Sequence, residues 1–183
     1  MAKLPQISNK TAVFAAVSVG FGLLFGALRP AFMQLDDLAA LVAALQVFVA
    51  DFDADALGFG AFAESMLRYG RLPALIWACA AFPKAFYAGY LVLYLHAMTL
   101  GFSAAMMVQA FGGRGFGMTL GLYAVQNLII LPICAYTIDF LAKKQPHGLS
   151  RDVIKTAAMG ILCVIFVSVL EVYVVPRFFE MMR

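Results

Sequence analysis

Charged residues are scarce in this sequence. Asp, Glu, Lys and Arg make up 13% of its 183 residues, whereas hydrophobic residues make up 64% and the mean hydropathy is +0.91. Soluble domains carry about 25% charged residues, so this composition excludes an ordinary soluble domain. The net charge of +3 includes no basic run long enough to hold a nucleic acid. The composition therefore predicts an integral membrane protein with no nucleic-acid partner.

Residue types that carry catalysis or bind metals are also rare. The chain has two histidines and three cysteines. Cys79, Cys134 and Cys163 each fall within an apolar run and lack metal-site spacing, so we expect them to act as small buried hydrophobic residues. The sequence contains no nucleophile elbow, no paired metal ligands and no phosphate-binding glycine loop. We therefore predict a protein that is not an enzyme and that uses no cofactor or metal.

The sequence contains several long apolar runs. They predict an all-α, polytopic bundle of transmembrane helices that forms one domain. A crossing takes roughly 20 residues, so the length suits about five spans. The predicted spans are residues 11–28, 70–83, 85–111, 116–141 and 153–175. The first run lacks the small residues of a cleavage site, so it is predicted to be a span rather than a signal peptide. The second is short unless its helix begins near Phe62, with Arg68 and Arg71 reaching the interface.

Residues 29–69, between the first two spans, are predicted to be an extracytoplasmic segment. Apolar residues at helical spacing from Leu38 to Phe48 predict an amphipathic helix, which a loop at 51–60 would join to a short helix near 61–68. The segment also holds most of the acids of the chain, namely Asp36, Asp37, Asp51, Asp53, Asp55 and Glu64. Two interpretations stay open: a docking surface for a partner, or a helix lying in the lipid interface.

Small residues recur at helical spacing in two of the predicted spans. Ser18, Gly22 and Gly26 lie on one side of the first, and Gly117 and Gly121 repeat the spacing in the fourth. Such strips let helices approach closely, although glycine is also simply common in membrane helices. Two strips are compatible with a homodimer, and equally with packing inside one chain.

Polar residues and prolines interrupt the last two spans. An unpaired side-chain amide in hydrocarbon costs several kcal/mol, and a proline inside a helix leaves a backbone carbonyl without its donor. We predict that these residues form an interhelical lock, with backbone carbonyls of the first-span glycine strip as partners for the amides. The predicted lock consists of Gln126, Asn127, Pro132, Glu171 and Pro176.

His96 lies within the predicted span 85–111. A membrane histidine can transfer protons. No second histidine falls in a span, and no carboxylate lies within one turn of His96. A hydrogen-bonded packing role is therefore the prediction.

Lysines predict the orientation of the chain in the membrane. With five spans all six fall on one side, which should be the cytoplasm by the positive-inside rule; they are Lys3, Lys10, Lys84, Lys143, Lys144 and Lys155. Six arginines fall on the other side, so the bias is small. The prediction is a plasma-membrane protein of a bacterium or archaeon, with a cytoplasmic N-terminus and an extracytoplasmic C-terminus.

Two motifs carry a resemblance to a known family. The Gln-Asn-Leu-Ile-Ile-Leu-Pro run at 126–132 and the Glu-Val-Tyr-Val-Val-Pro run at 171–176 resemble the stage II sporulation protein M family. Val125 stands where sporulation members tend to have Pro, and Val175 where a Thr or Ser often precedes the closing Pro. Another branch has an acid at the position of Ile130, so an ion-binding role is not transferred to this chain.

The resemblance implies a role in the cell envelope. Family members in spore formers are taken to be the multi-pass, non-enzymatic subunit of a peptidoglycan-remodelling complex, together with a cell-wall amidase and a lytic transglycosylase, during engulfment. Relatives in circular-bacteriocin clusters imply export or self-protection instead.

Two functions follow from the sequence as hypotheses. The first is a membrane scaffold, embedded in lipid, that positions envelope proteins such as cell-wall hydrolases through residues 36–64. The alternative is a transport or export subunit, for a bacteriocin-like peptide or a small solute, in which Gln126, Asn127, Pro132 and Glu171 line a polar path.

Overall fold

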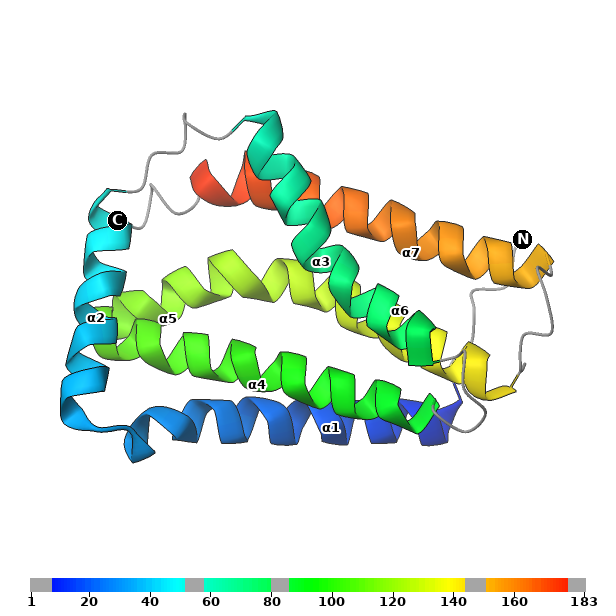
Figure 1. Cartoon of the computed structure of the whole chain (residues 1–183), viewed down its shortest axis with the longest axis horizontal. Helices are drawn as coiled ribbons and strands as arrows, with labels where there is room; N and C mark the ends of the chain where they lie inside the picture. The colour runs from blue at the N-terminus through cyan, green and yellow to red at the C-terminus, as the bar shows by residue number, and fades with distance from the viewer. Residues whose placement is uncertain (1–7, 52–57, 80–85, 144–150, 178–183) are drawn as a thin grey trace.

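The computed structural model describes residues 8–51, 58–79, 86–143 and 151–177, and within these ranges it contains helices and no strands (Figure 1). The predicted all-α class is confirmed. The α-helices are α1 (Asn9–Leu28), α2 (Leu35–Ala50), α3 (Phe59–Cys79), α4 (Phe86–Phe111), α5 (Gly113–Thr119), α6 (Val125–Lys143) and α7 (Arg151–Val169). A 3₁₀ turn, η1 (Arg29–Phe32), follows α1, and two π turns, η2 (Leu120–Ala124) and η3 (Leu170–Val174), precede α6 and follow α7.

Four of these segments are long and apolar enough to cross a membrane. They are Asn9–Phe32, Tyr87–Phe111, Val125–Lys143 and Arg151–Arg177, judged by length and composition within the described ranges. They correspond to the predicted spans 11–28, 85–111, 116–141 and 153–175. The chain is therefore a multi-pass membrane protein by these criteria, as its composition predicts.

The predicted span 70–83 and the predicted short helix near 61–68 are one helix, α3. It begins at Phe59 and continues through Pro73 to Cys79, so no helix boundary falls between residues 69 and 70. The charged residues Glu64, Arg68 and Arg71 are all exposed along it, and they lower its apolar character below that of the four spans. The predicted loop 51–60 ends where α3 begins, and residues 52–57 and 80–83 of these predictions lie outside the described ranges.

The order of contacts fixes the directions of the helices. Phe14 of α1 packs against Tyr90 of α4 with ring centroids 5.8 Å apart, and Phe25 packs against Tyr94 further along both helices. Helices α1 and α4 therefore run parallel, so the chain between them returns along α3. Figure 1 shows the starts of α1, α4 and α7 at one end of the bundle together with the end of α6.

Helix α2 lies across the opposite end of the bundle (Figure 1). Its buried Val49 packs with Met107 of α4 and Met118 of α5, and the Gln46 amide donates a hydrogen bond to the Ala110 carbonyl. There the chain reverses at Gly112, whose φ of 61° is one that side chains rarely adopt. Helix α2 thus covers the turn between α4 and α5.

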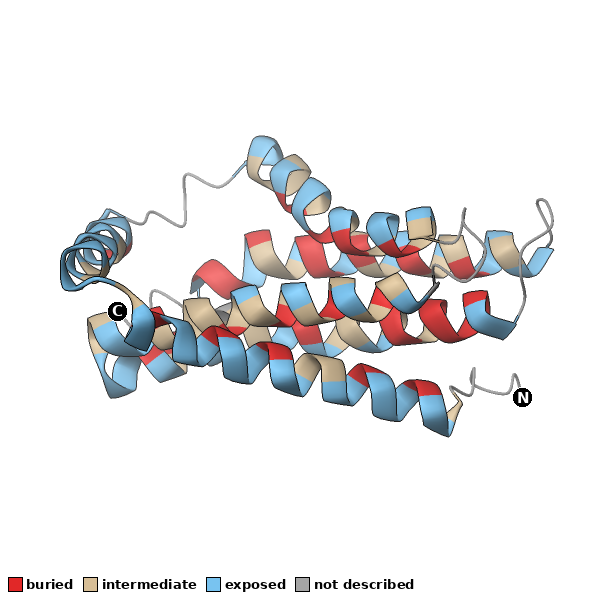
Figure 2. Ribbon diagram, turned by 60° about the horizontal axis from the view of Figure 1, so that its bottom comes forward, coloured by how far each residue is buried: buried red, intermediate tan, exposed pale blue. Residues whose placement is uncertain are grey.

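The apolar surface of the bundle is divided between an inner and an outer face. Ile76, Leu93, Ile130, Ile138 and Val167 are fully buried, and Figure 2 shows buried residues on the facing sides of α3, α4, α6 and α7. Large hydrophobic residues such as Phe14, Phe21, Leu24, Phe25 and Leu128 are exposed on the outside. An outer surface of this kind is suited to contact with lipid tails.

The glycine strip of α1 faces α4. A Cβ atom added to Gly22 would lie 2.8 Å from the Ala97 Cβ, and one added to Gly26 would meet the Met98 carbonyl. From the other side, a Cβ on Gly101 would meet the Leu23 carbonyl. The two backbones therefore touch, so this strip is used within one chain rather than at a dimer interface. Ser18 is half-buried in the same helix.

The second predicted strip is placed differently. A Cβ added to Gly121 would meet nothing within 4 Å, and Gly117 is half-buried. Gly121 is thus not at a close helix contact. A tight contact lies instead at Gly115, two residues before Gly117, where a Cβ would meet the Met107 carbonyl of α4.

Replacing Gly26 by Ala is expected to lower the free energy of unfolding by about 1–3 kcal/mol, because the methyl group collides with α4 backbone that cannot move aside. Gly20→Ala is the matched control, since its Cβ would meet nothing within 4 Å. The control should gain up to about 1 kcal/mol from helix propensity. Thermal unfolding of both variants in one detergent measures this, and equal melting temperatures would contradict the close contact.

Candidate polar site between α3, α6 and α7

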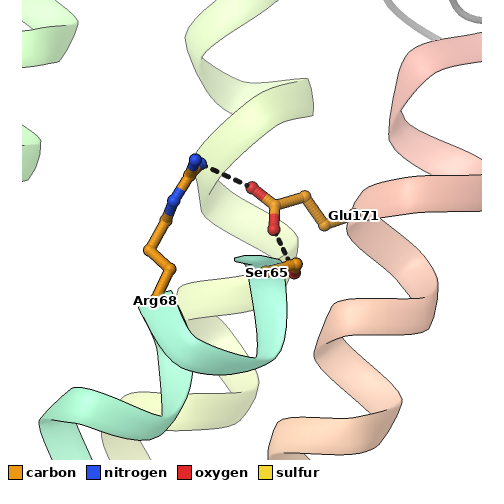
Figure 3. A network of polar contacts seen from close by, with 3 residues as sticks. All are labelled: Ser65, Arg68 and Glu171. Atoms are coloured by element: carbon orange, nitrogen blue, oxygen red, sulfur yellow. Dashed lines mark hydrogen bonds and ion pairs between the residues drawn. The ribbon is translucent and has the colours of Figure 1, made fainter. Parts of the chain in front are cut away.

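Glu171 is bound on both carboxylate oxygens by side chains of α3 (Figure 3). The Arg68 guanidinium donates to Oε1 at 3.1 Å, and the Ser65 hydroxyl donates to Oε2. Ser65 is 3% exposed, whereas the side chains of Glu171 and Arg68 are 21% and 65% exposed. The carboxylate therefore ties the end of α7 to α3, with Ser65 on the buried side and Arg68 on the open side.

Two π turns bring further polar groups to this contact. Glu171 itself lies in η3, and Tyr123 lies in η2, near enough to Arg68 and Glu171 to interact with both charges. The buried Tyr69 of α3 also faces the Glu171 carboxylate. Single π turns occur frequently at functional sites, which makes this junction the candidate site of the molecule.

Two fully buried polar side chains have no hydrogen-bond partner among the described residues: Gln126, through both atoms of its amide, and Ser168, through its hydroxyl. Gln126 lies three residues after Tyr123 and Ser168 three residues before Glu171, spacings that place residues on one side of a helix. Leaving such groups unpaired in an apolar surrounding costs about 1–3 kcal/mol each on protein scales. The helices that meet at the junction therefore hold hydrogen-bonding groups that the described fold does not use.

Asn127, the neighbour of Gln126, joins α6 to α4. Its amide nitrogen donates to the Tyr123 carbonyl at 2.7 Å, so its Oδ1 is left to accept from His96 Nε2 at 2.9 Å. The expectation that α1 carbonyls would accept from this amide is wrong, because the accepting Tyr123 carbonyl lies on the preceding π turn η2 and the donor to Oδ1 lies on α4. His96 has the hydrogen-bonded packing contact that its isolation in the sequence predicts.

Asp139 forms a polar contact that the sequence patterns do not predict. Its buried carboxylate accepts from the Thr11 hydroxyl at 2.8 Å and from the Lys143 ammonium at 2.6 Å. Thr11 lies in the first turn of α1, so an anion there is favoured by the unpaired amides of that helix end. The Asp139–Lys143 spacing of four residues at the end of a span is the signal that could have identified it.

The remaining predicted residues are not gathered into one site. Pro132 is exposed in the middle of α6, and Pro176 is buried just beyond η3. The predicted lock is thus two separate contacts, Asn127 with α4 and Glu171 with α3. Among the described residues, no group of three His, Cys, Asp or Glu side chains could hold a metal ion.

The predicted partner surface is exposed where it is described. Asp36 and Asp37 lie in the first turn of α2, Asp51 follows its last residue, and Glu64 lies on α3. All four are exposed, and none forms an ion pair with a described residue. Asp53 and Asp55 lie outside the described ranges.

Comparisons with known proteins identify no relative of this chain. A scan against protein-family models found no match, and searches of curated proteins and of solved structures found none either. The resemblance to the stage II sporulation protein M family therefore depends on the motifs at 126–132 and 171–176. Residues of both motifs, Gln126 and Glu171 among them, lie on the helices that meet at the polar junction.

Removing the two adjacent amides of α6 one at a time is expected to change the free energy of unfolding in opposite directions. Asn127→Leu should lower the free energy of unfolding by about 1–3 kcal/mol, because His96 loses its acceptor. Gln126→Met keeps the length of the side chain and removes an unpaired amide, so it should raise that free energy by about 1 kcal/mol. Thermal unfolding in detergent compares the two variants. Destabilisation by Gln126→Met would show that its amide has a partner beyond the described contacts.

The two bonds of Glu171 are expected to differ in strength. Double-mutant cycles that combine Glu171→Gln with Ser65→Ala or with Arg68→Ala separate them. The Ser65 coupling should be the larger, because exposed ion pairs contribute little. Glu64→Gln, on the exposed side of α3, is the control and should leave stability unchanged. A dominant Arg68 coupling would contradict this assignment.

Proposed function

We propose that the protein is a non-enzymatic membrane scaffold whose extracytoplasmic end recruits an envelope protein that acts on the cell wall. The observation that carries the proposal is the contrast between two sets of polar residues. Inside the bundle, Asn127, Asp139 and Glu171 each bind a neighbouring helix. The described acids of the 29–69 segment are exposed and unpaired at one end. The first set holds the bundle together, and the second is free to bind a partner.

The arrangement of α2 supports this surface. Leu35, Val47 and Phe48 are 82%, 60% and 60% exposed, which suits a helix that lies in the membrane interface. Asp36 and Asp37 lie at its start and Asp51 at its end. In the proposal α2 rests on lipid and presents carboxylates at both ends to the outside.

The proposed topology has five spans, with α3 as the second. Because α1 and α4 run parallel, the chain between them must cross back, and α3 is the described helix that does so. Among the described residues near helix ends, Lys10, Lys143, Arg151 and Lys155 lie at the end where α1 starts, and Arg29, Arg114 and Arg177 at the other. By the positive-inside rule the lysine end is cytoplasmic, so α2 is outside.

The resemblance to the stage II sporulation protein M family points to the kind of partner. In that family the membrane subunit is taken to work with cell-wall hydrolases, and the proposal gives this chain the same place in a complex.

Replacing Asp36, Asp37 and Asp51 together by Asn is expected to reduce recovery of the partner several-fold when the protein is crosslinked in membranes and purified. Loss of three carboxylates removes the charge that the partner is proposed to bind. Lys155→Gln, exposed at the opposite end of the bundle, is the control and should keep full recovery. Equal recovery from both variants would refute this surface.

The orientation of the chain in the membrane is tested separately by labelling single cysteines in intact cells. After Cys79, Cys134 and Cys163 are replaced by Ala, a single Cys at position 51 should react with a membrane-impermeant maleimide added outside. A Cys at position 155 should react only after lysis. The reverse pattern would move α2 to the cytoplasm and end the cell-wall proposal.

The unpaired amide of Gln126 and hydroxyl of Ser168 favour transport or export as the second candidate, because polar groups inside a bundle often line a substrate path. Glu171 would then belong to the path, but Asn127 and Pro132 border a different cavity. Solute flux into proteoliposomes of purified protein separates the candidates. Solute flux that is abolished by Gln126→Met would show that the protein is a transporter and would refute the scaffold proposal.

A further inference from the structure

A long apolar groove lies between α1, α4 and the α5–α6 segment. Its volume is about 720 Å³, and it is lined by residues that include Ala12, Ala16 and Leu23 of α1, Leu93 and Leu100 of α4, and Leu128 of α6. Small side chains such as Ala12 and Ala16 leave the groove hollow. Its walls belong to three of the four segments able to cross a membrane.

The mouth of this groove opens on the outer surface of the bundle. Leu128 is 75% exposed and Leu23 is 42% exposed, and Pro132 at the rim is exposed as well. In a membrane these residues face hydrocarbon, so the groove is open to lipid tails along its side.

One end of the groove is closed by polar and charged groups. Ala12 and Ala135 are lining residues, and the adjoining turns hold the Thr11–Asp139 hydrogen bond. Beyond it lies the Lys143 ammonium, whose side chain is 54% exposed.

This end of the bundle has an excess of positive charge among its described residues. The cationic residues are Lys10, Lys143, Arg151 and Lys155, and the acids are Asp139 and Asp152. Asp139 and Lys143 form a 2.6 Å ion pair that neutralises both, which leaves the three cations Lys10, Arg151 and Lys155 against Asp152. The end therefore attracts anions, as the anionic surface of a membrane provides.

The length and walls of the groove suit a lipid chain. Along α1 the lining extends from Ala12 to Leu23, which is about 16 Å at 1.5 Å per residue. The lining is almost entirely apolar along this length and is open on the side that faces lipid, so an extended hydrocarbon chain can enter from the membrane.

We propose that this groove binds one acyl chain of an anionic phospholipid, with the lipid phosphate beside Lys143. The apolar walls hold the chain, and the cationic end selects the headgroup. The proposal is independent of the scaffold function, because it concerns α1, α4 and α6 rather than α2.

Native mass spectrometry of the delipidated protein, titrated with phosphatidylglycerol or phosphatidylcholine, tests the site. Ala16→Trp and Ala124→Phe fill the groove from two walls, and each should weaken binding of phosphatidylglycerol about tenfold. Ala158→Trp is the matched control, because Ala158 is exposed on α7, and it should bind like the unmodified protein. If one of the two filling variants fails to fold, the other still tests whether filling the groove weakens lipid binding.

The headgroup contact is tested separately by charge. Lys143→Gln should lower the preference for phosphatidylglycerol over phosphatidylcholine about fivefold, since one cation near a membrane surface contributes about that much, whereas Lys143→Arg should keep the preference. Unchanged lipid binding in both filling variants overturns the proposal. So does a dimer that Ala16→Trp dissociates, because the groove would then belong to a second copy of the chain.

Discussion

Hydrocarbon offers no hydrogen bonds, so a polar side chain inside this bundle is stabilised only by a partner on the protein, which Gln126 and Ser168 lack among the described residues. Three contacts meet that constraint and connect the helices in pairs. Asn127 joins α6 to α4, Asp139 joins α6 to α1, and Glu171 joins η3 to α3. Helix α6 takes part in two of the three. The apolar core alone would let helices slide along one another, and these contacts fix their register.

Close backbone packing adds a second restraint on one pair. Gly22, Gly26 and Gly101 let α1 and α4 touch along their length, so these two parallel helices form a rigid pair. Helix α3 is held differently. Its buried Leu72 and Ile76 pack in the same core as Ile138 of α6 and Val167 of α7, and its polar link to η3 depends on one carboxylate.

Sequence patterns predict where the helices of this protein lie in the chain better than they predict which helices contact one another. Apolar runs locate the four long segments because burial in lipid demands them, and the glycine spacing of α1 identifies a face that packs closely. The extent of α3 is missed, because its charged residues divide one helix into an apparent surface segment and a short span. The π turns at 120–124 and 170–174 leave no trace in hydrophobic periodicity.

The candidate site could be predicted in part. Buried amides and Glu171 stand out in apolar runs, so their importance is visible in the sequence. Their partners are not, since His96, Ser65 and Thr11 lie 31, 106 and 128 residues from the groups they bind. Only the three-dimensional fold shows that Asn127 and Glu171 serve different helix pairs, and that Asp139 belongs with them.

The contact between Thr11 and Asp139 has a consequence for the order of assembly. Helix α1 is made before α6, and the helices α2, α3, α4 and α5 are synthesised between them. The carboxylate that binds the first turn of α1 is therefore absent when α1 is made. The parallel partner of α1, α4, also comes after two intervening helices. Until α6 is made, the opening turn of α1 must be satisfied by the water and headgroups of the membrane surface.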